Sequence, residues 1–431
     1  MNIKNTLLAG FAAIGLAQVA SADVHFTLTG STANADATHS AIKNMLTSSG
    51  NSLTSYAFET GSLTGSKVAI FKGTVSGVSG NVYVKTHFNG SELGVQSTAH
   101  GDNITFLADS VADNAPVNGT ANVSSSSETD NSAPSACMSD TYQGTSRFAS
   151  GATITVSGSP VTYTALTGFD GSAGLTGVVP FKFIATSDAP FSNLTTQQAQ
   201  ALWAAGKIPL DAFTGSTSDA SKYVYATGRD IDSGTRLSAM LAIGFPANGS
   251  IKQYQPTSTG TTQVTAVPVS GTTTYKLIAF PAATVNGISQ ALYNSGYTSG
   301  GSLSKALAAP ASVYGGTANL AAIIGYAGVN DADPRITGYS SGGSYNKELS
   351  FNGVTLGNVN GNYNTVTALT GGLYTFWTYE HMYFSSATAA DTTGIATVGA
   401  AIGNRLKTYD SVVLLTSMTV SRNADMGTIN Y

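Results

Sequence analysis

Short runs of apolar residues recur along the chain and predict strands that are separated by helical stretches. Residues 24–28, VHFTL, alternate and lead into a Gly-Ser-Thr loop and a stretch with helical spacing around Ile42. The apolar runs 178–184 and 321–329 predict two further buried strands. Because strands and helices alternate through most of the chain, we expect an α/β fold with a largely parallel core.

The clearest helix prediction covers residues 195–206. Thr195 and Gln198 have the spacing of a capping box, and Gly206 supplies a stop. Apolar spacing also predicts helices after Ser233 and over residues 395–406. Further strands are expected at 68–71, 81–88, 366–379 and 412–415, and a further helix is expected from residue 92. The remaining stretches are expected to be a loop or insertion at 110–135, a hairpin or excursion at 255–275 and a polar connection at 330–349.

The first 22 residues have the features of a secretory signal peptide. Lys4 precedes a mostly apolar stretch, residues 7–19, and Ala20-Ser21-Ala22 is a small-x-small cleavage pattern. Cleavage there predicts a mature chain of 431 − 22 = 409 residues, located in the periplasm or secreted. Cys137 is the only cysteine, so no lipid-bearing cysteine follows the signal and no internal disulfide is expected.

The chain carries little charge. Charged residues make up 10% of the sequence and the formal net charge is −4, whereas about a quarter of a typical soluble protein is charged. This composition excludes the broad basic surface of a nucleic-acid-binding protein. The five histidines show no paired metal-ligand spacing, so neither a metal nor a cofactor is expected.

Three predicted strand-to-helix junctions carry small hydroxyl residues: Gly-Ser-Thr at 30–32, Gly-Ser at 90–91 and Ser-Gly-Thr at 233–235. A helix start offers unpaired N–H donors and the positive end of a dipole, and one such junction alone is an ordinary N-cap. Arg229 precedes the third junction and would add a full charge with a fork that fits two oxygens. Together, these features indicate a site for a tetrahedral oxyanion.

Asp140, in the sequence MSD, narrows the identity of the anion. An ionised aspartate only accepts hydrogen bonds, so it can accept one from the P–OH group of hydrogen phosphate. Sulfate has no such proton at neutral pH and would be repelled. An aspartate among anion-binding donors therefore favours phosphate over sulfate.

The order of these motifs resembles the phosphate-binding proteins of bacterial ABC importers, which have the type II periplasmic binding-protein fold. LTGSTA, NGSELGV, MSD and GRDIDSGTR resemble the phosphate loops of this family, and NLTTQQAQALWAAGKIPL, IIGYAGV, LSFNGVTLG and ALTGGLYTFW resemble its other landmarks. The resemblance spans most of the chain after residue 22. Its most specific part is the order Arg-x-x-x-Ser-Gly-Thr at 229–235.

The resemblance implies two lobes joined by crossing hinge strands, with lobe I formed by 23–182 plus 331–431 and lobe II by 183–330. The strand crossings would fall near 179–184 and 327–331. It also implies that the chain is not an enzyme, that it binds inorganic phosphate, and that its partner is the membrane permease of an ABC importer; we expect a monomer. The implied phosphate-binding residues are Thr32, Ala33, Ser91, Asp140, Arg229, Ser233, Gly234 and Thr235.

The chain departs from the family pattern in three places. Ile231 stands where an acidic partner of Arg229 is expected, which leaves Asp230 or Asp232 for that role. Ala33 stands where an aromatic residue is common. The chain is also longer than expected, with the excess around 100–135 and 245–275.

Two other functions remain open from the sequence. An extracellular surface or matrix protein that retains a binding-protein fold would suit the low charge and the abundance of Ser, Thr, Gly and Asn. Residues 338–342, GYSSG, match the Gly-x-Ser-x-Gly pattern of a hydrolase nucleophile. That pattern needs an apolar strand before it and a helix after it, whereas polar sequence flanks it here, so a loop is predicted.

Overall fold

The computed structural model describes residues 22–431 except 124–128, 259, 268–272, 337–344, 358, 360 and 410–412. Nearly all of the predicted signal peptide, 1–21, and the whole GYSSG motif lie outside the described residues. Across the described ranges, no helix combines the length and the apolar character that a membrane crossing requires.

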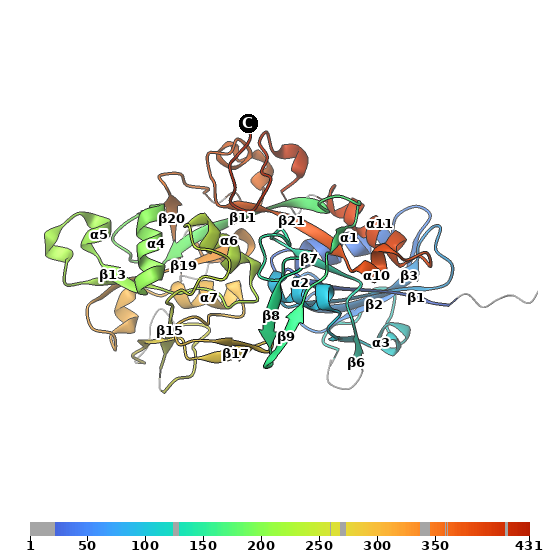
Figure 1. The fold of residues 1–431 in the computed structure, drawn as a ribbon, viewed down its shortest axis with the longest axis horizontal. Helices are drawn as coiled ribbons and strands as arrows, with labels where there is room; N and C mark the ends of the chain where they lie inside the picture. The colour runs from blue at the N-terminus through green and yellow to red at the C-terminus, as the bar shows by residue number, and fades with distance from the viewer. Residues whose placement is uncertain are drawn as a thin grey trace, which may run out of the picture.

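Within the described ranges, one mixed sheet of thirteen strands runs through the molecule, with the main order β13-β14-β19-β11-β21-β7-β1-β4-β3-β2 (Figure 1). These strands are β1 Val24–Gly30, β2 Ser52–Phe58, β3 Val68–Thr74, β4 Val82–Phe88, β7 Ala136–Ser139, β11 Leu175–Ala185, β13 Lys207–Pro209, β14 Tyr223–Ala226, β19 Leu320–Gly328 and β21 Trp377–Phe384. Off this path lie β10 Thr167–Gly168, β12 Asn193–Leu194 and β20 Lys347–Phe351. We call β2, β3, β4, β1 and β7 the β1 side, and β19, β14 and β13 the β19 side.

The α/β fold class is confirmed, but the core is not largely parallel. Only the pairs β1–β4, β1–β7, β14–β19 and β12–β20 are parallel among the described strands of this sheet. The reason is the connectivity: β2, β3 and β4 follow one another through short connections, which allow antiparallel pairing only. The long strands β11 and β21 also pair antiparallel with their neighbours.

Strand β11 joins the two sides of the sheet. Its first half, from Leu175 to Pro180, pairs with β21, and its second half, from Phe181 to Ala185, pairs with β19. The sequence of this strand is mostly apolar, which fits a position covered on both faces, and its one charged residue, Lys182, is buried in ion pairs with Asp333 and Glu348. β20 pairs with residues 183–185 of β11, on the β19 side, so this part of the chain after 331 lies beside the second half of β11. The lobe boundaries remain a prediction.

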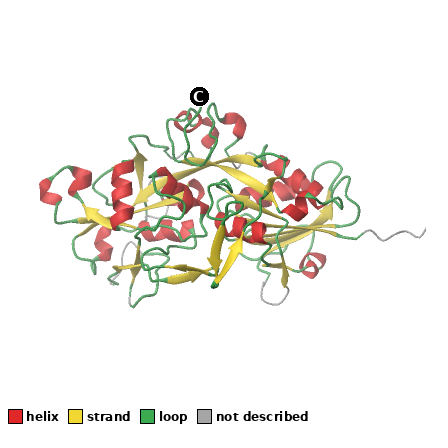
Figure 2. Cartoon of the chain, viewed as in Figure 1, coloured by secondary structure: helices red, strands yellow, loops and turns green. Residues whose placement is uncertain are grey.

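Helices flank the sheet on both faces (Figure 2). They are α1 Ala35–Leu46, α2 Ser91–His100, α3 Asp109–Asp113, α4 Thr196–Ala205, α5 Asp211–Thr214, α6 Gly234–Ala242, α7 Gly300–Leu307, α8 Val329–Ala332, α9 Thr367–Thr370, α10 Ser386–Ala389 and α11 Ile395–Leu406, with 3₁₀ turns at 217–219, 311–314, 333–335, 363–365 and 415–417. The capping box of α4 is confirmed: Gln198 N–H donates to the Thr195 hydroxyl, and Thr195 N–H donates to Gln198 Oε1.

Among the described residues, four two-stranded sheets extend from this framework: β5 Ile104–Leu107 with β6 Thr129–Ser132, β8 Thr153–Val156 with β9 Ser159–Thr162, β15 Tyr254–Thr257 with β16 Lys276–Ala279, and β17 Ala283–Val285 with β18 Ile288–Gln290. The β15–β16 pair brings together the two ends of the stretch 255–275, for which a hairpin or excursion is expected.

Each side of the sheet has a large apolar cluster of its own. On the β1 side, Phe26, Ile42 and Ile402 are fully buried, so α1 and α11 pack on β1. On the β19 side, Phe183 and Trp203 are fully buried where α4 covers the sheet. Each large side chain buried in this way stabilises the fold by about 1.5–3 kcal/mol.

Two strand predictions are wrong, and a third stretch is more ordered than a loop. Residues 110–135, for which a loop or insertion is expected, contain β6, which pairs with β5 and whose Asp130 forms an ion pair with Lys85. Residues 366–379 are not one strand, because α9 precedes β21 and Gly372, with φ 77°, makes a turn between them. Of the strand expected at 412–415, the described residues 413–415 form one bridge, between Val413 and Val178. At 366–379 the turn at Gly372 overrides the local apolar pattern.

Candidate functional site

Three loops of the β1 side come together at one edge of the sheet. β4, β1 and β7 are adjacent and parallel, so the segments that follow them emerge side by side. Gly90 N–H donates to the Gly30 carbonyl at 2.8 Å, and Ser31 N–H donates to the Met138 carbonyl at 2.9 Å. The loops at 31–33, 90–91 and 139–140 therefore form one surface, as the sequence motifs implied.

The start of α6, from the β19 side, contacts this surface. Glu92 N–H donates to the Asp232 carbonyl at 3.0 Å, and the Thr235 hydroxyl donates to Asp140 Oδ2 at 3.4 Å. Gly234 approaches so closely that a Cβ added to it would lie 1.6 Å from Asp140 Oδ1. A side chain at position 234 is therefore excluded while the two sides remain in contact.

Three helices begin around this contact, and two of them lack a side-chain cap. The N-cap of α1 is Asn34, whose side chain makes no capping bond, and the N-cap of α2 is Gly90. The hydroxyl of Ser233 caps α6 by accepting from Arg236 N–H at 3.3 Å. In α1 the Ala37 N–H is already taken by the Asp36 side chain. In α2 the Glu92 N–H is taken by the Asp232 carbonyl, so an anionic ligand would reach the Glu92 N–H only after that carbonyl moves away.

Asp140 lies at the centre of the contact and is only 1% exposed. Burial raises the pKa of its carboxyl group, while Ser91, Arg229 and Thr235 act to lower it. Its backbone N–H donates to Ser91 Oγ at 3.4 Å. Among the described residues, Oδ1 has no hydrogen-bond partner. A buried acceptor with spare capacity is what the recognition of a protonated oxyanion requires.

A second buried carboxyl group, Glu380 of β21, lies next to Asp140. It accepts from the Ser31 hydroxyl at 3.3 Å, which connects β21 to the first loop. Burial raises the pKa of Glu380 well above its usual range, and the charge of Asp140 raises it further. The pair therefore favours a state in which one carboxyl group carries a proton.

Arg229 supplies positive charge from the β19 side and is 3% exposed. Its Nε donates to the Tyr297 carbonyl at 3.1 Å and its Nη2 to the Thr298 carbonyl at 3.0 Å, which fixes the guanidinium plane. Its charge acts to lower the pKa of Asp140 and Asp331, so it is electrostatically coupled to acids that follow β7 and β19.

Of the two acids offered as partners of Arg229, the structure favours Asp230. Burial raises the pKa of Asp230, and Arg229 is the strongest of the charges that oppose this rise. Asp232 instead accepts a hydrogen bond from the Asn286 side chain. Burial, with the charge of Asp230, raises the pKa of Asp232 to about 7. Ile231 between them is buried in an apolar cluster.

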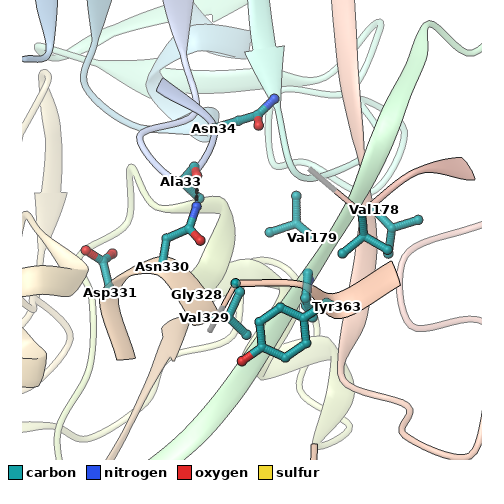
Figure 3. Close-up of a pocket in the computed structure, with 12 residues that line it drawn as sticks. Ala33, Asn34, Val178, Val179, Gly328, Val329, Asn330, Asp331 and Tyr363 are labelled. Carbon is teal, nitrogen blue, oxygen red and sulfur yellow. Dashed lines mark hydrogen bonds between the residues drawn. The ribbon is translucent and has the colours of Figure 1, made fainter. Parts of the chain in front are cut away.

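Thr32 and Ala33 are half-buried. Ala33 lines a cavity of about 40 Å³ together with 178–180 and 328–331 (Figure 3). The Asn330 side chain donates to the Ala33 carbonyl at 3.3 Å across this cavity. The cavity lies beside the Asp140 contact, and none of its lining residues comes from the other predicted loops.

The eight predicted residues therefore fall into three groups. The structure brings Ser91, Asp140, Gly234 and Thr235 into direct contact, with Ser233 at the cap of α6. Arg229 acts on this group through its charge. The first loop is joined to the same surface through Ser31, but Ala33 faces the neighbouring cavity and Thr32 lies between these two residues. The roles of all eight residues as phosphate ligands remain predictions.

Sequence reasoning missed three acids at this site: Glu92, Asp331 and Glu380. Glu92 is buried and accepts from the hydroxyls of Thr141 and Ser146. A signal was present for Glu380, because it is the only acid in the aromatic run WTYEHMYF, where burial is predictable. Asp331 was visible as an acid directly after an apolar strand in a chain with few charges.

Other polar residues behave as structural groups. Cys137 is fully buried, and burial raises the pKa of its thiol to about 12, so it is unsuited to act as a nucleophile. Across the described part of the chain, no three His, Cys, Asp or Glu side chains are grouped so as to hold a metal ion.

No protein-family model and no curated protein matches this sequence. Among solved structures, a Clostridium perfringens protein, provisionally named a phosphate ABC transporter substrate-binding protein and solved with bound phosphate, is 13% identical, with TM-score 0.41 over 91% of this chain and 99% of that chain. An ABC-type phosphate transport receptor from Vibrio cholerae is 11% identical, with TM-score 0.42 over 90% and 99%. PstS from Borrelia burgdorferi is 11% identical, with TM-score 0.35 over 89% and 92%.

These neighbours carry names from the family that the sequence motifs resemble, and their alignments span about nine-tenths of this chain. At such identities and TM-scores the likeness carries no functional argument.

Proposed function

We propose that this chain is a secreted or periplasmic solute-binding protein that binds one inorganic phosphate between two lobes and delivers it to the permease of an ABC importer. The observation that carries this proposal is the position of Asp140. Its buried carboxyl group follows β7, contacts the start of α6 from the other side of the sheet, and keeps one oxygen without a partner among the described residues.

The groups around Asp140 suit a dianion that carries one proton. The hydroxyls of Ser91 and Thr235 and the charge of Arg229 would face its oxygens, together with the first-turn N–H groups of α2 once the Asp232 carbonyl has moved away from Glu92 N–H. Asp140 would accept the hydrogen bond from P–OH. Because the whole chain has a net charge of −4, this local concentration of donors has to supply the attraction.

Ligand entry requires the two sides to separate. Glu92 N–H and the Asp232 carbonyl are 3.0 Å apart, and Thr235 and Asp140 are hydrogen-bonded, so no space for phosphate remains between these atoms. The connections between the sides include β11 and the end of β19, where a small change in backbone angles would open the site. In this proposal they are the crossing strands between lobe I, 23–182 plus 331–431, and lobe II, 183–330.

A thermal-shift panel with phosphate, arsenate, sulfate and molybdate tests the proposal. A ligand that binds only the folded state raises the apparent melting temperature by mass action. We expect phosphate and arsenate to stabilise the protein and sulfate to leave it unchanged. A chain that responds to none of the four anions is not a phosphate-binding protein.

A further inference from the structure

Two hairpins meet tip to tip on the side of the molecule opposite β11 and β21 (Figure 1). The first is β8–β9, residues 153–162, and the second is β17–β18, residues 283–290. Ser157 N–H donates to the Gly287 carbonyl at 2.7 Å between the two tips. In Figure 1, β11 and β21 lie in the upper part of the molecule beneath the C-terminal segment, and the hairpins lie at the bottom, with α2 and α6 at heights between them.

Both tips have the same tight turn. Ser157 and Gly158 have φ of 49° and 84°, and Asn286 and Gly287 have φ of 45° and 77°. Positive φ at both central residues defines the type I′ turn, whose twist matches that of the flanking strands. The hairpins are therefore stiff extensions of the fold, and the tip contact joins two rigid elements.

The two hairpins belong to opposite sides of the sheet. β8–β9 is attached to α2, because Thr164 N–H just after β9 donates to the Ala99 carbonyl at 3.1 Å. β17–β18 is attached to the segment after β14, because Tyr297 N–H donates to the Gly228 carbonyl at 2.8 Å. The tip contact therefore spans the same boundary as the Asp140–Thr235 hydrogen bond.

Apolar packing strengthens this contact. Ile288 is buried in a cluster with Val95, Phe148 and Tyr163, which all come from the β1 side. Val156 packs so closely on the second tip that a Cβ added to Gly287 would lie 2.6 Å from Val156 Cγ1. Burial of this kind favours the closed arrangement and is lost when the sides separate.

The second tip also reaches the candidate anion site. The Asn286 amide donates to the Asp232 carboxylate, and its carbonyl accepts from the Gln96 side chain of α2 at 3.4 Å. Asp232 in turn contacts Glu92 through its backbone carbonyl. Asp232 is therefore the one residue that connects Asn286 to the facing starts of α2 and α6.

We propose that these two hairpins form a clasp that keeps the two sides of the molecule closed and limits the rate at which a bound anion leaves. The clasp acts opposite the crossing strands, so the site opens only when the hairpin tips part. Asn286 is a positioning residue, because it acts on the site through Asp232. The statement about lobe closure stands on its own, whereas the statement about anion release rests on the proposed function.

Small-angle X-ray scattering of the ligand-free full chain tests closure without reference to phosphate. Val156→Asp places a charge in the apolar tip contact. Thr155→Asp is the matched control, because the neighbouring residue of a strand points to the opposite face and Thr155 is exposed. We expect a larger radius of gyration for Val156→Asp than for wild type and Thr155→Asp. Equal radii in the three folded proteins would overturn the clasp.

Release of radiolabelled phosphate into excess unlabelled phosphate tests the second statement. We expect release from Val156→Asp to be about tenfold faster than from wild type, because changes at a contact of this kind appear mainly in the dissociation rate. Asn286→Gly provides a milder variant that keeps the positive φ of the turn and removes only the amide bond to Asp232. It should also release phosphate faster than wild type.

The outcomes separate the two proposals. If wild type binds no phosphate, the proposed function fails, and the scattering comparison alone decides the clasp. If Val156→Asp does not fold, the radius of gyration of Asn286→Gly takes its place in that comparison. Folded variants that keep both the wild-type radius and the wild-type release rate contradict the clasp.

Discussion

The hydroxyl of Thr235 donates a hydrogen bond to Asp140 Oδ2 at 3.4 Å, although the two residues lie 95 positions apart in the chain. Asp140 ends β7 on the β1 side, and Thr235 lies in the first turn of α6, which follows β14 on the β19 side. This contact therefore closes the boundary between the two sides. An anion bound there would replace this hydrogen bond: the Thr235 hydroxyl would donate to the anion, and the Asp140 carboxylate would accept from the proton of the anion.

Replacing Arg229 by alanine should weaken phosphate binding strongly. Loss of a charged hydrogen bond to a buried anion costs about 1.5–3 kcal/mol or more, which is roughly a 10- to 150-fold loss of affinity. Titration calorimetry of the variant with phosphate measures this loss. Unchanged affinity would remove Arg229 from the site.

A stability control is needed for this variant, because Arg229 also donates to the carbonyls of Tyr297 and Thr298. Arg229→Lys keeps the charge but cannot reproduce the planar fork. We expect it to bind phosphate more strongly than Arg229→Ala and more weakly than wild type. Denaturant unfolding of both variants shows how much of the effect comes from folding.

Replacing Asp140 by asparagine should relax the discrimination against sulfate. The amide removes the negative charge and can donate a hydrogen bond to an unprotonated oxygen. The ratio of phosphate to sulfate affinity, measured by calorimetry at neutral pH, should fall by at least about tenfold in the variant. If Asp140→Asn still excludes sulfate, another group must detect the proton of phosphate.

The same selectivity should depend on pH in the wild-type protein. Burial raises the pKa of Asp140, so its carboxyl group gains a proton at a higher pH than an exposed aspartate does. Once protonated it can donate to sulfate. We therefore expect sulfate to compete better as pH falls, measured by competition against labelled phosphate. Selectivity that stays constant across the acidic range would contradict a role for this carboxylate.

Asp425 should destabilise the fold as pH rises. Burial raises its pKa to about 7, whereas an unfolded aspartate titrates near about 3.9. The folded state thus binds more protons between these two values, so this group's contribution to stability falls as pH rises through that window and levels off above it. His39 and His381, whose pKa burial lowers to about 4, act in the opposite direction over part of the same window.

A comparison with Asp425→Asn isolates this effect from the histidines. The variant's free energy of unfolding relative to wild type should rise between about pH 4 and pH 7, by on the order of a few kcal/mol, since one pKa unit corresponds to about 1.4 kcal/mol. Urea unfolding at several pH values measures the difference. A difference that does not change with pH would show that Asp425 titrates normally.

Gly94 of α2 should not tolerate a side chain. A Cβ there would lie 2.5 Å from Gly30 Cα, so Gly94→Ala pushes α2 away from β1 and from the loop that follows it. Overpacking of this kind costs about 1–3 kcal/mol. Gly144→Ala is the matched control, because nothing lies within 4 Å of its added Cβ. Thermal unfolding should show a lower midpoint for Gly94→Ala alone.

Elements whose signals are local were predictable from the sequence. Thr195, Gln198 and Gly206 specify both ends of α4, and the spacing over 395–406 matches α11 residue for residue. The apolar run 178–184 identified β11 for the same reason. β6 was missed because its sequence, TDNS, is polar, and it becomes a strand only through its pairing with β5.

The sequence predicted which residues form the candidate site better than it predicted how they are arranged in space. Motif order identified the segments around Ser91, Asp140 and Thr235, which the fold brings into contact. The position of Glu380 depends on pairing between distant strands, and the meeting of the two hairpin tips depends on how the two sides of the molecule pack, which no local pattern encodes. The burial of Glu380 could be suspected from its aromatic neighbours, but its bond to Ser31 could not.

The most direct test of the central claim is the location of arsenate in crystals grown with it, from the anomalous scattering of arsenic. Arsenate carries a proton at neutral pH as phosphate does, so Asp140 should accept it in the same way. The account predicts one anomalous peak in contact with Asp140, Ser91 and Thr235. A peak elsewhere in the molecule, with these three residues still touching one another, would contradict it.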